Sequence, residues 1–349
     1  MREADTPATH ASVHELAVAL SLDEAAYQRA VELARLRPHR SDWLRYLDHF
    51  LTATGALLIV AGIAAFFAWN WADLHHMAKF ALIEAGIVAA VIIAWRLGID
   101  TIGGRANLFA AAFLVGILFA VFGQVYQTGA DPYGLFMAWA ILILPWVLVG
   151  RQAALWLLFQ VLLNLTLIMY WTQVLHPPNG WWQLTQLLGP LVWLGTTVID
   201  SGLASWLFAL NAGALVLWEA ASYRGVPYLQ GRTCPRIVAL MALHTVLAPT
   251  LVLIFAASAG PKLSLSIVSP LLFAAAFAMA LWYYQFRKAD LFMLTAALFG
   301  SILVIMALAI RFIFDAFPSL FILTVLLVAL VAGAAWWLKG VSRRWEVTA

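Results

Sequence analysis

Glu84 is the residue whose type and position most directly suggest chemistry. It lies in an apolar stretch five residues after Lys79, which on a helix places it about 7 Å deeper along the axis. An ionisable group at membrane depth is costly and usually faces the bundle interior with a partner. We expect Lys79 or Arg311 as counter-ion, or Gln124 and Tyr126 as hydrogen-bond donors. The alternative is a packing role, in which the carboxylate bonds a neighbouring helix or reaches the interface.

A second polar group interrupts apolar sequence in "FGQVYQTGADPYG", residues 122–134. Asp131 precedes Pro132 with a glycine on each side, which is good turn chemistry and needs no function. Other polar residues follow the apolar stretch 50–69 or end the stretch 291–310. Together the candidate binding residues are Asn70, Trp71, Asp73, Glu84, Gln124, Tyr126, Gln127, Asp131, Arg311 and Asp315.

The composition shows what kind of chain must position these residues. Of 349 residues 64% are hydrophobic and 11% are charged, well below the roughly 25% usual in soluble domains, and the mean hydropathy is +0.91. No soluble core could absorb so much apolar surface. The net charge of +3 comes from scattered Lys and Arg residues, which argues against a nucleic-acid partner. A single cysteine, Cys234, excludes an internal disulfide and a multi-thiolate metal site.

Stretches long enough to cross a bilayer recur along most of the chain. A helix needs about 20 apolar residues, with a range of about 17 to 25, to span the hydrocarbon core. We therefore predict an all-α fold, a polytopic transmembrane helix bundle whose main partner is the lipid bilayer. The candidate spans are 50–69, 79–95, 108–127, 135–149, 153–171, 182–199, 203–220, 237–257, 267–286, 291–310 and 318–338.

Positive charge at span ends predicts the topology, because Lys and Arg favour the cytoplasmic side. Basic residues between 35 and 45 place the N-terminus in the cytoplasm. Eleven crossings would put Arg232 and the basic C-terminal residues outside, whereas ten crossings keep them inside. The weakest span is 182–199, because its polar residues and Pro190 suit a re-entrant or interfacial helix. We predict ten spans, with eleven as the alternative.

Residues 1–49 are predicted to form a short helical segment before the bundle of residues 50–349. "SVHELAVALSLDEAAYQRAVELARLRP" indicates two helices, with Ser21 and Glu24 at capping-box spacing and Leu22 and Leu33 on an apolar side of the second helix. We expect this segment to lie at the membrane surface or on the protein's own loops. Docking of a membrane or cytoplasmic protein partner is the alternative.

Two stretches, "GIAAFFAWNWADLHHMAKF" and "GQVYQTGADPYGLFMAWAILILP", resemble the bacterial membrane-protein family called domain of unknown function 2157. The resemblance is specific over residues 42–150. It implies a bacterial inner-membrane protein with an N-terminal helical segment and a multi-span region, and it brings no assigned activity. The matching motif positions here are Asn70, Trp71, Gln124, Tyr126, Asp131 and Trp139.

Polar and small side chains inside the other spans are predicted to serve helix packing. Gln160 and Asn164, one turn apart, are expected to bond across helices, and Asn211 and Glu219 to do likewise. Small residues four apart would let helices approach closely. These pairs are Ala112 with Gly116, Ala296 with Gly300, and Ala329 with Gly333.

On the ten-span topology the candidate binding residues share the outer face of the membrane, where one polar cavity could contain most of them. No spacing typical of metal ligands, nucleotide loops or nucleophiles occurs, so we predict no metal site and no cofactor. Acid–base catalysis needs paired groups within reach of a substrate, and no such spacing is evident. The sequence therefore favours a protein that is not an enzyme.

Three functions remain open. The first is binding or transport of a small solute or lipid headgroup through the outer-face cavity. The second is a non-catalytic membrane scaffold or regulator of an envelope partner, with residues 1–49 as its interaction segment. The third, less favoured, is a membrane transferase or hydrolase that uses Asp73, Glu84 or Asp131 as acid or base.

Overall fold

A computed structural model describes residues 10–34, 74–126, 132–175, 201–256, 267–313 and 318–348, with isolated positions between 43 and 58. Its contacts divide the chain into two units, Met1–His75 and His76–Ala349. The first predicted span, 50–69, lies outside the described residues apart from isolated positions, as does the predicted boundary between residues 49 and 50. That boundary stays a prediction.

In the first unit, two short helices are described, α1 (His10–Ala19) and α2 (Glu24–Leu33). The N-cap of α2 is Asp23, whose Oδ1 accepts a hydrogen bond from the amide of Ala26 at 2.7 Å. The predicted capping box was wrong, because the turn places Asp23 rather than Ser21 directly before the helix. Leu33, on the predicted apolar side, is 85% exposed, whereas Val31 is buried.

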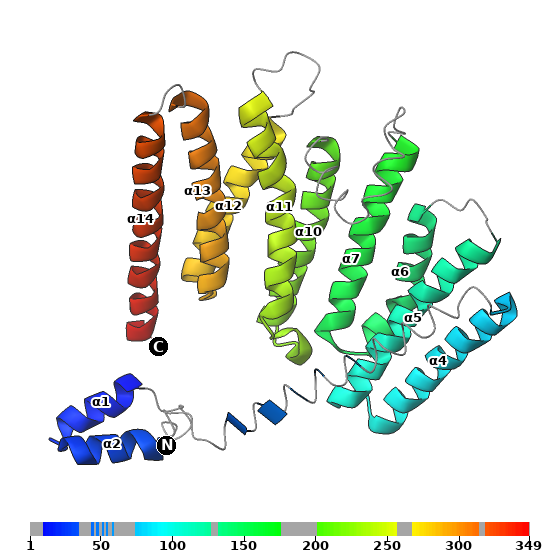
Figure 1. Cartoon of the computed structure of the whole chain (residues 1–349), viewed down its shortest axis with the longest axis horizontal. Coiled ribbons are helices and arrows are strands. Elements are labelled where there is room, and N and C mark those ends of the chain that lie inside the picture. The colour runs from blue at the N-terminus through cyan, green and yellow to red at the C-terminus, as the bar shows by residue number, and fades with distance from the viewer. Residues whose placement is uncertain are drawn as a thin grey trace. The chain divides into compact units, whose positions relative to one another are not determined.

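The second unit is a helix bundle (Figure 1). In the described part of the chain, nine helices are long and apolar enough to cross a membrane, and no strand is present, which confirms the polytopic all-α fold. They are α4 (His76–Leu97), α5 (Ile102–Tyr126), α6 (Pro132–Val149), α7 (Ala153–Tyr170, continued by the π-helical turn Trp171–Leu175), α10 (Ser201–Tyr223), α11 (Thr233–Ala256), α12 (Val268–Phe286), α13 (Leu291–Ile313) and α14 (Pro318–Thr348).

Several helices continue past the apolar stretches that predicted them. The clearest case is α14, which runs ten residues beyond the predicted end at residue 338 and carries Arg343 and Arg344 in its last turns. Basic side chains near a helix C-terminus interact favourably with the helix dipole, and they anchor a span at the membrane interface. Hydropathy therefore marks the hydrocarbon-spanning part of a helix rather than the whole helix.

Small residues bring two of the helix pairs close together, as predicted. A Cβ on Gly116 of α5 would lie 2.4 Å from the Trp139 ring of α6, and the Trp139 indole donates a hydrogen bond to the carbonyl of Ala112 at 2.8 Å. A Cβ on Gly300 of α13 would lie 3.2 Å from Leu243 of α11. Gly333 of α14 differs, because a Cβ there would meet no atom within 4 Å. The predicted close approach at Gly333 is therefore absent.

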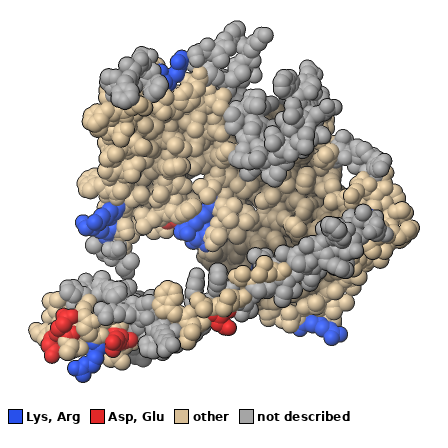
Figure 2. All heavy atoms as spheres, viewed as in Figure 1, with Lys and Arg blue, Asp and Glu red and all other residues tan. Residues whose placement is uncertain are grey.

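Basic residues concentrate on one side of the bundle, which we call the basic side. It holds the connections 98–101, 150–152, 224–232 and 287–290, which lie at the same end of the bundle in Figure 1. Among the described residues of this unit, every Lys and Arg lies near the basic side except Lys79 and Arg311. On the face of the bundle that Figure 2 shows, the described area between the two ends carries no Lys, Arg, Asp or Glu side chain. We call the other end the opposite side.

The side on which α10 begins bears on the span count. The helices α7 and α10 run antiparallel, because Asn164 bonds Asn211 while Ile168 packs with Leu203 and Leu207. The helix α7 therefore ends on the side where α10 begins. This is the arrangement expected if the chain between them does not cross the membrane. The segment 182–199 itself lies outside the described residues, and the total of ten spans remains a prediction.

Candidate functional site

Glu84 lies beside a hollow between α4 and α5. The hollow has a volume of about 200 Å³ and is lined by Phe80 and Glu84 of α4 and by Leu118, Phe119 and Phe122 of α5. Glu84 is eight residues after the first residue of α4, so it lies about 12 Å from the opposite-side end of the helix. Glu84 is thus exposed on the surface of the bundle, within a helix that is long and apolar enough to cross a membrane.

The structure pairs Glu84 with none of its predicted partners. Among the described residues the Glu84 carboxylate makes no hydrogen bond and no ion pair. The predicted donor Tyr126 instead stacks on Phe80, with ring centroids 6.0 Å apart, and contacts Phe122 at 4.7 Å. Glu84 is therefore an unpaired acid beside a group of aromatic rings.

The other described candidates lie toward the opposite side of the bundle, but they do not all meet. Gln124 and Tyr126 are exposed in the last turn of α5. Arg311 is exposed near the end of α13, which packs on α11, α12 and α14 rather than on α4 or α5. The structure therefore does not bring Arg311 to the hollow at Glu84. The remaining candidates, Asn70, Trp71, Asp73, Gln127, Asp131 and Asp315, lie outside the described residues.

The predicted amide contacts between helices are present in the middle of the bundle. Asn211 of α10 is fully buried, and its Oδ1 accepts from Gln160 at 2.9 Å and from Asn164 at 3.0 Å. Its amide nitrogen donates to Asn164 Oδ1 at 2.7 Å. Because buried polar groups are costly unless bonded, this reciprocal arrangement joins α7 to α10. Its role is structural.

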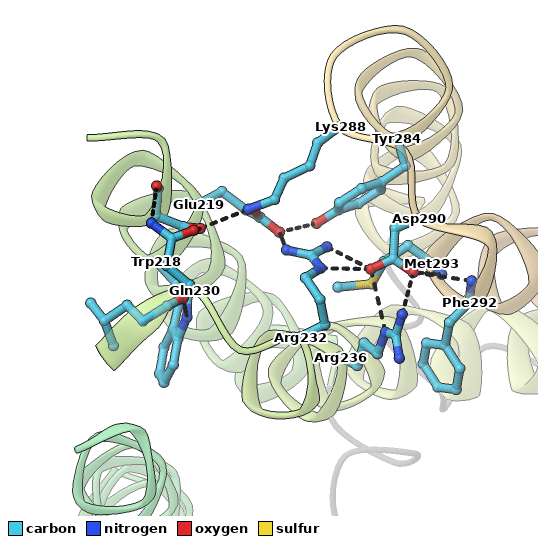
Figure 3. A network of polar contacts seen from close by, with 12 residues as sticks. Trp218, Glu219, Gln230, Arg232, Arg236, Tyr284, Lys288, Asp290, Phe292 and Met293 are labelled. Atoms are coloured by element: carbon cyan, nitrogen blue, oxygen red, sulfur yellow. Dashed lines mark hydrogen bonds and ion pairs between the residues drawn. The ribbon is translucent and has the colours of Figure 1, made fainter. Parts of the chain in front are cut away.

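A larger polar network, which contains the acids Glu219 and Asp290, lies at the basic side of the bundle (Figure 3). The buried Glu219 of α10 accepts three hydrogen bonds. Its Oε1 accepts from Arg232 at 2.8 Å and from the hydroxyl of Tyr284 at 3.1 Å, and its Oε2 accepts from Lys288 at 2.9 Å. These donors belong to the α10–α11 connection, to α12 and to the α12–α13 connection, so one carboxylate joins three segments.

Asp290 is the second acid of this network. Its Oδ2 accepts from Arg232 Nε at 2.7 Å, and its Oδ1 accepts from Arg236 at 3.0 Å. The same Oδ1 accepts from the backbone amides of Phe292 and Met293, so that Asp290 caps α13. Arg232 bonds both carboxylates, which makes it the centre of the network.

The ionisation of these groups follows from their contacts. Burial alone would raise the pKa of Asp290, but the hydrogen bonds from Arg236 and Arg232 outweigh burial and hold that pKa below its usual value. Burial opposes the charge of Arg232, whose pKa is nevertheless raised because Glu219 and Asp290 both accept from it. The contacts between Arg232 and Asp290 therefore favour the charged form of both groups.

Sequence reasoning identified Glu219 as a helix-contact residue but missed Asp290. One signal was available, because Asp290 follows Arg287 and Lys288 in a short connection and directly precedes the helix Leu291–Ile313. An acid at that position is a typical N-cap. The described residues contain no group of three or more His, Cys, Asp or Glu residues arranged to hold an ion.

Comparison with known proteins confirms the resemblance over part of the chain. The model of a family described as "Predicted membrane protein (DUF2157)" matches residues 16–156. This match covers the region from α1 to the beginning of α7, including the hollow at Glu84, and stops before Glu219 and Asp290. No curated protein and no solved structure matches the chain.

Proposed function

We propose that this membrane protein binds an organic cation at the hollow between α4 and α5, namely a small amine or the amine-bearing headgroup of a lipid. The single observation that carries the proposal is the unpaired Glu84 carboxylate. An unpaired charge near hydrocarbon is unfavourable, so a cationic ligand would supply the partner that the described residues do not.

The aromatic lining supports a cation rather than a neutral solute. Phe80, Phe119 and Phe122 line the same hollow as Glu84, and the faces of aromatic rings attract ammonium groups within about 6 Å. Such rings also accept the methyl or methylene groups of an alkylammonium. One carboxylate and several phenyl rings therefore favour a ligand with one positive charge and apolar substituents.

The size of the hollow limits the ligand. A water molecule takes up about 30 Å³ of liquid volume, so about 200 Å³ corresponds to roughly six or seven waters. Pockets for drug-sized molecules usually hold about 300 to 1,000 Å³. An alkylammonium headgroup fits this limit, with any longer chain extending into the bilayer.

The test measures binding of dodecyltrimethylammonium to the full chain in maltoside detergent by calorimetry. We expect saturable binding that is lost in Glu84→Gln and weakened in Phe122→Leu. Asp100→Asn is the matched control, because Asp100 is an exposed acid in the connection between α4 and α5 on the basic side. Unchanged binding to Glu84→Gln, or equal losses in both acid variants, would overturn the proposal.

Tetramethylammonium separates the two sources of the cation. If it binds as well as the long-chain compound, the natural ligand is a water-soluble amine. If only the amphiphile binds, the natural ligand is a lipid or a lipid-like amine. Binding of dodecyl sulfate with equal strength would show that the hollow only absorbs detergent.

We further propose that the protein lies in a bacterial inner membrane with the basic side in the cytoplasm. The concentration of Lys and Arg on that side supports this orientation. The only native thiol, Cys234, can be removed as Cys234→Ser, so that single thiols report each side. A membrane-impermeant thiol reagent should label Tyr126→Cys in intact spheroplasts and Asp100→Cys only after permeabilisation. The reverse pattern would invert the orientation.

A scaffold role is the alternative function, and the first unit favours it. Val18 and Leu20 near the end of α1 are 68% and 63% exposed, and Leu33 of α2 is more exposed still. Deletion of residues 1–40 should then remove a co-purifying envelope protein while membrane insertion persists, and Leu33→Asp should have the same effect. Unchanged co-purification would contradict the scaffold.

A further inference from the structure

The first turn of α5 carries an arginine whose donors are not used by the described residues. Arg105 is half-buried, and its Nε atom is enclosed without a hydrogen-bond partner. No described carboxylate pairs with it. Asp100, the acid nearest to it in the sequence, is exposed and bonds no described residue. Arg105 therefore has a positive charge and a buried donor that the described part of the chain leaves unsatisfied.

The connection between α6 and α7 supplies further unused donors. Gln152 is the residue directly before α7, yet it is only 6% exposed, its side chain caps no amide, and its Nε2 atom is enclosed without a partner. The preceding Arg151 is exposed, and no described acid pairs with it. The first backbone amides of a helix have no partner within that helix, so the start of α7 adds donors to those of Arg151 and Gln152.

Packing between α5 and α6 brings Arg105 to this connection. Leu108 of α5 lies against Gly150, where an added Cβ would be 2.7 Å from the leucine side chain. Further along α5, the carbonyl of Ala112 accepts a hydrogen bond from Trp139 of α6. Arg105 precedes Leu108 by three residues and Ala112 by seven, so all three lie on the face of α5 that contacts α6. Helix side chains tilt toward the N-terminus, so the guanidinium extends toward the α6–α7 connection.

An anion suits these donors better than water does. Water can accept hydrogen bonds from the two enclosed nitrogens, but it leaves the charges of Arg105 and Arg151 unneutralised. A phosphate group has several acceptor oxygens, and its geometry matches the fork of donors on a guanidinium. The N-terminus of a helix also favours anions, through its free amides and its dipole. Two unpaired arginines, one buried amide and the start of α7 therefore indicate a phosphate group.

From this combination we propose that Arg105, Arg151, Gln152 and the first turn of α7 bind a phosphate group on the basic side of the bundle. The phosphate belongs either to a lipid headgroup or to a soluble phosphate compound, and the test separates the two. The site does not depend on the ligand proposed for Glu84, because that hollow begins at Leu118, about 20 Å further along α5.

Unfolding of the full chain in maltoside detergent tests the proposal, since a ligand of the folded state raises the unfolding midpoint. One probe is inorganic phosphate, compared with chloride at equal ionic strength. The other is dioctanoyl phosphatidic acid, compared with dioctanoylglycerol, which lacks the phosphate. A rise with inorganic phosphate indicates a soluble phosphate as the ligand, and a rise with phosphatidic acid alone indicates a lipid headgroup. No rise with either probe above its comparison compound would overturn the proposal.

Arginine variants test which residues bind the phosphate. Arg105→Gln and Arg151→Gln should each weaken the affinity at least about tenfold, the effect of losing one charge-assisted hydrogen bond. Arg287→Gln is the matched control, because Arg287 is exposed at the basic-side end of α12, which packs on α10, α11 and α13. It should leave the affinity within about twofold, as expected for a distant site. Equal losses in the test and control variants would show only a general attraction to positive charge and would contradict the site.

Gln152→Glu distinguishes a binding site from a cluster with a structural role alone. The new carboxylate would give Arg105 an acceptor within the chain, so the midpoint of the ligand-free protein should rise. The same carboxylate would repel phosphate, so the response to the phosphate probe should disappear. An unchanged response to phosphate in this variant would refute the placement of Gln152 beside the bound group.

Discussion

Glu84 and Glu219 are both glutamates in membrane-spanning helices, yet their surroundings differ completely. Glu219 is buried and accepts hydrogen bonds from Arg232, Tyr284 and Lys288. Glu84 is exposed beside phenyl rings and bonds no described residue. The carboxylate of Glu219 accepts hydrogen bonds from its own chain, whereas the carboxylate of Glu84 accepts none from the described residues. Two acids within spans therefore differ in whether donors of the described residues reach them.

This contrast follows from the segments around each acid. The connections near Glu219 carry Arg232 and Lys288, so donors reach it from two sides. Glu84 faces α5, which presents Leu118, Phe119 and Phe122 to it. The predictions below test the contrast in order of decreasing effect.

Removing the Asp290 carboxylate should cause the largest loss of stability. Asp290→Ala removes the carboxylate that Arg236 bonds, leaves Arg232 with Glu219 alone, and removes the cap of α13. We expect a loss of about 3 kcal/mol, at the lower end for a broken buried ion pair because Arg236 is partly exposed. Unfolding monitored in detergent measures it, with Asp290→Asn as the control that retains an acceptor for the cap. Equal stability of Asp290→Ala and the native chain would refute the structural role.

Asn211→Leu should cost less, because it removes neutral hydrogen bonds only. The buried amides of Gln160 and Asn164 would lose their partner in α10, with an expected loss of about 1 to 2 kcal/mol. Thr166→Val is the control, since Thr166 bonds only the carbonyl of Leu162 in its own helix. A larger loss in the control than in Asn211→Leu would contradict the proposed link between α7 and α10.

Acidification should weaken the ion pairs of Asp290 with Arg232 and Arg236 without any mutation. The pKa of Asp290 is lower in the folded chain than in the unfolded one, so its stabilising contribution is complete above the unfolded value of about 4. The contribution is lost as pH falls through the folded pKa. When the pH is lowered below about 4, the thermal unfolding midpoint of the native chain should therefore decrease. The midpoint of Asp290→Asn should decrease less over the same pH range. Parallel curves for the two proteins would show that Asp290 does not contribute.

Glu84→Gln should have the smallest effect on stability. No described partner loses a bond, so we expect a change within about 0.5 kcal/mol, as for an ordinary surface substitution. Glu219→Gln, the same chemical change at the paired glutamate, should lower the unfolding midpoint clearly. If the two variants lost stability equally, the distinction between a paired and an unpaired glutamate would fail.

The sequence predicted the features that depend on local pattern. Hydropathy identified the spans, and amides one turn apart identified the contact of Gln160 and Asn164 with Asn211. It could not predict that Asp290 meets Arg232, because 58 residues separate them and only helix packing joins them. For Glu84 the sequence correctly indicated an unusual acid but suggested partners that packing places elsewhere. Pairing of side chains between distant helices requires the tertiary arrangement, which no local pattern encodes.

The network around Glu219 and Asp290 also has a consequence for the order of membrane insertion. During synthesis α10 and α11 emerge first, and at that stage Glu219 has only Arg232 as a charged partner. Lys288 and Asp290 follow more than 50 residues later. The second half of the bundle can therefore close only after the start of α13 has left the ribosome. A nascent chain that ends before this point lacks Asp290, the carboxylate that Arg232 and Arg236 both bond at the basic side.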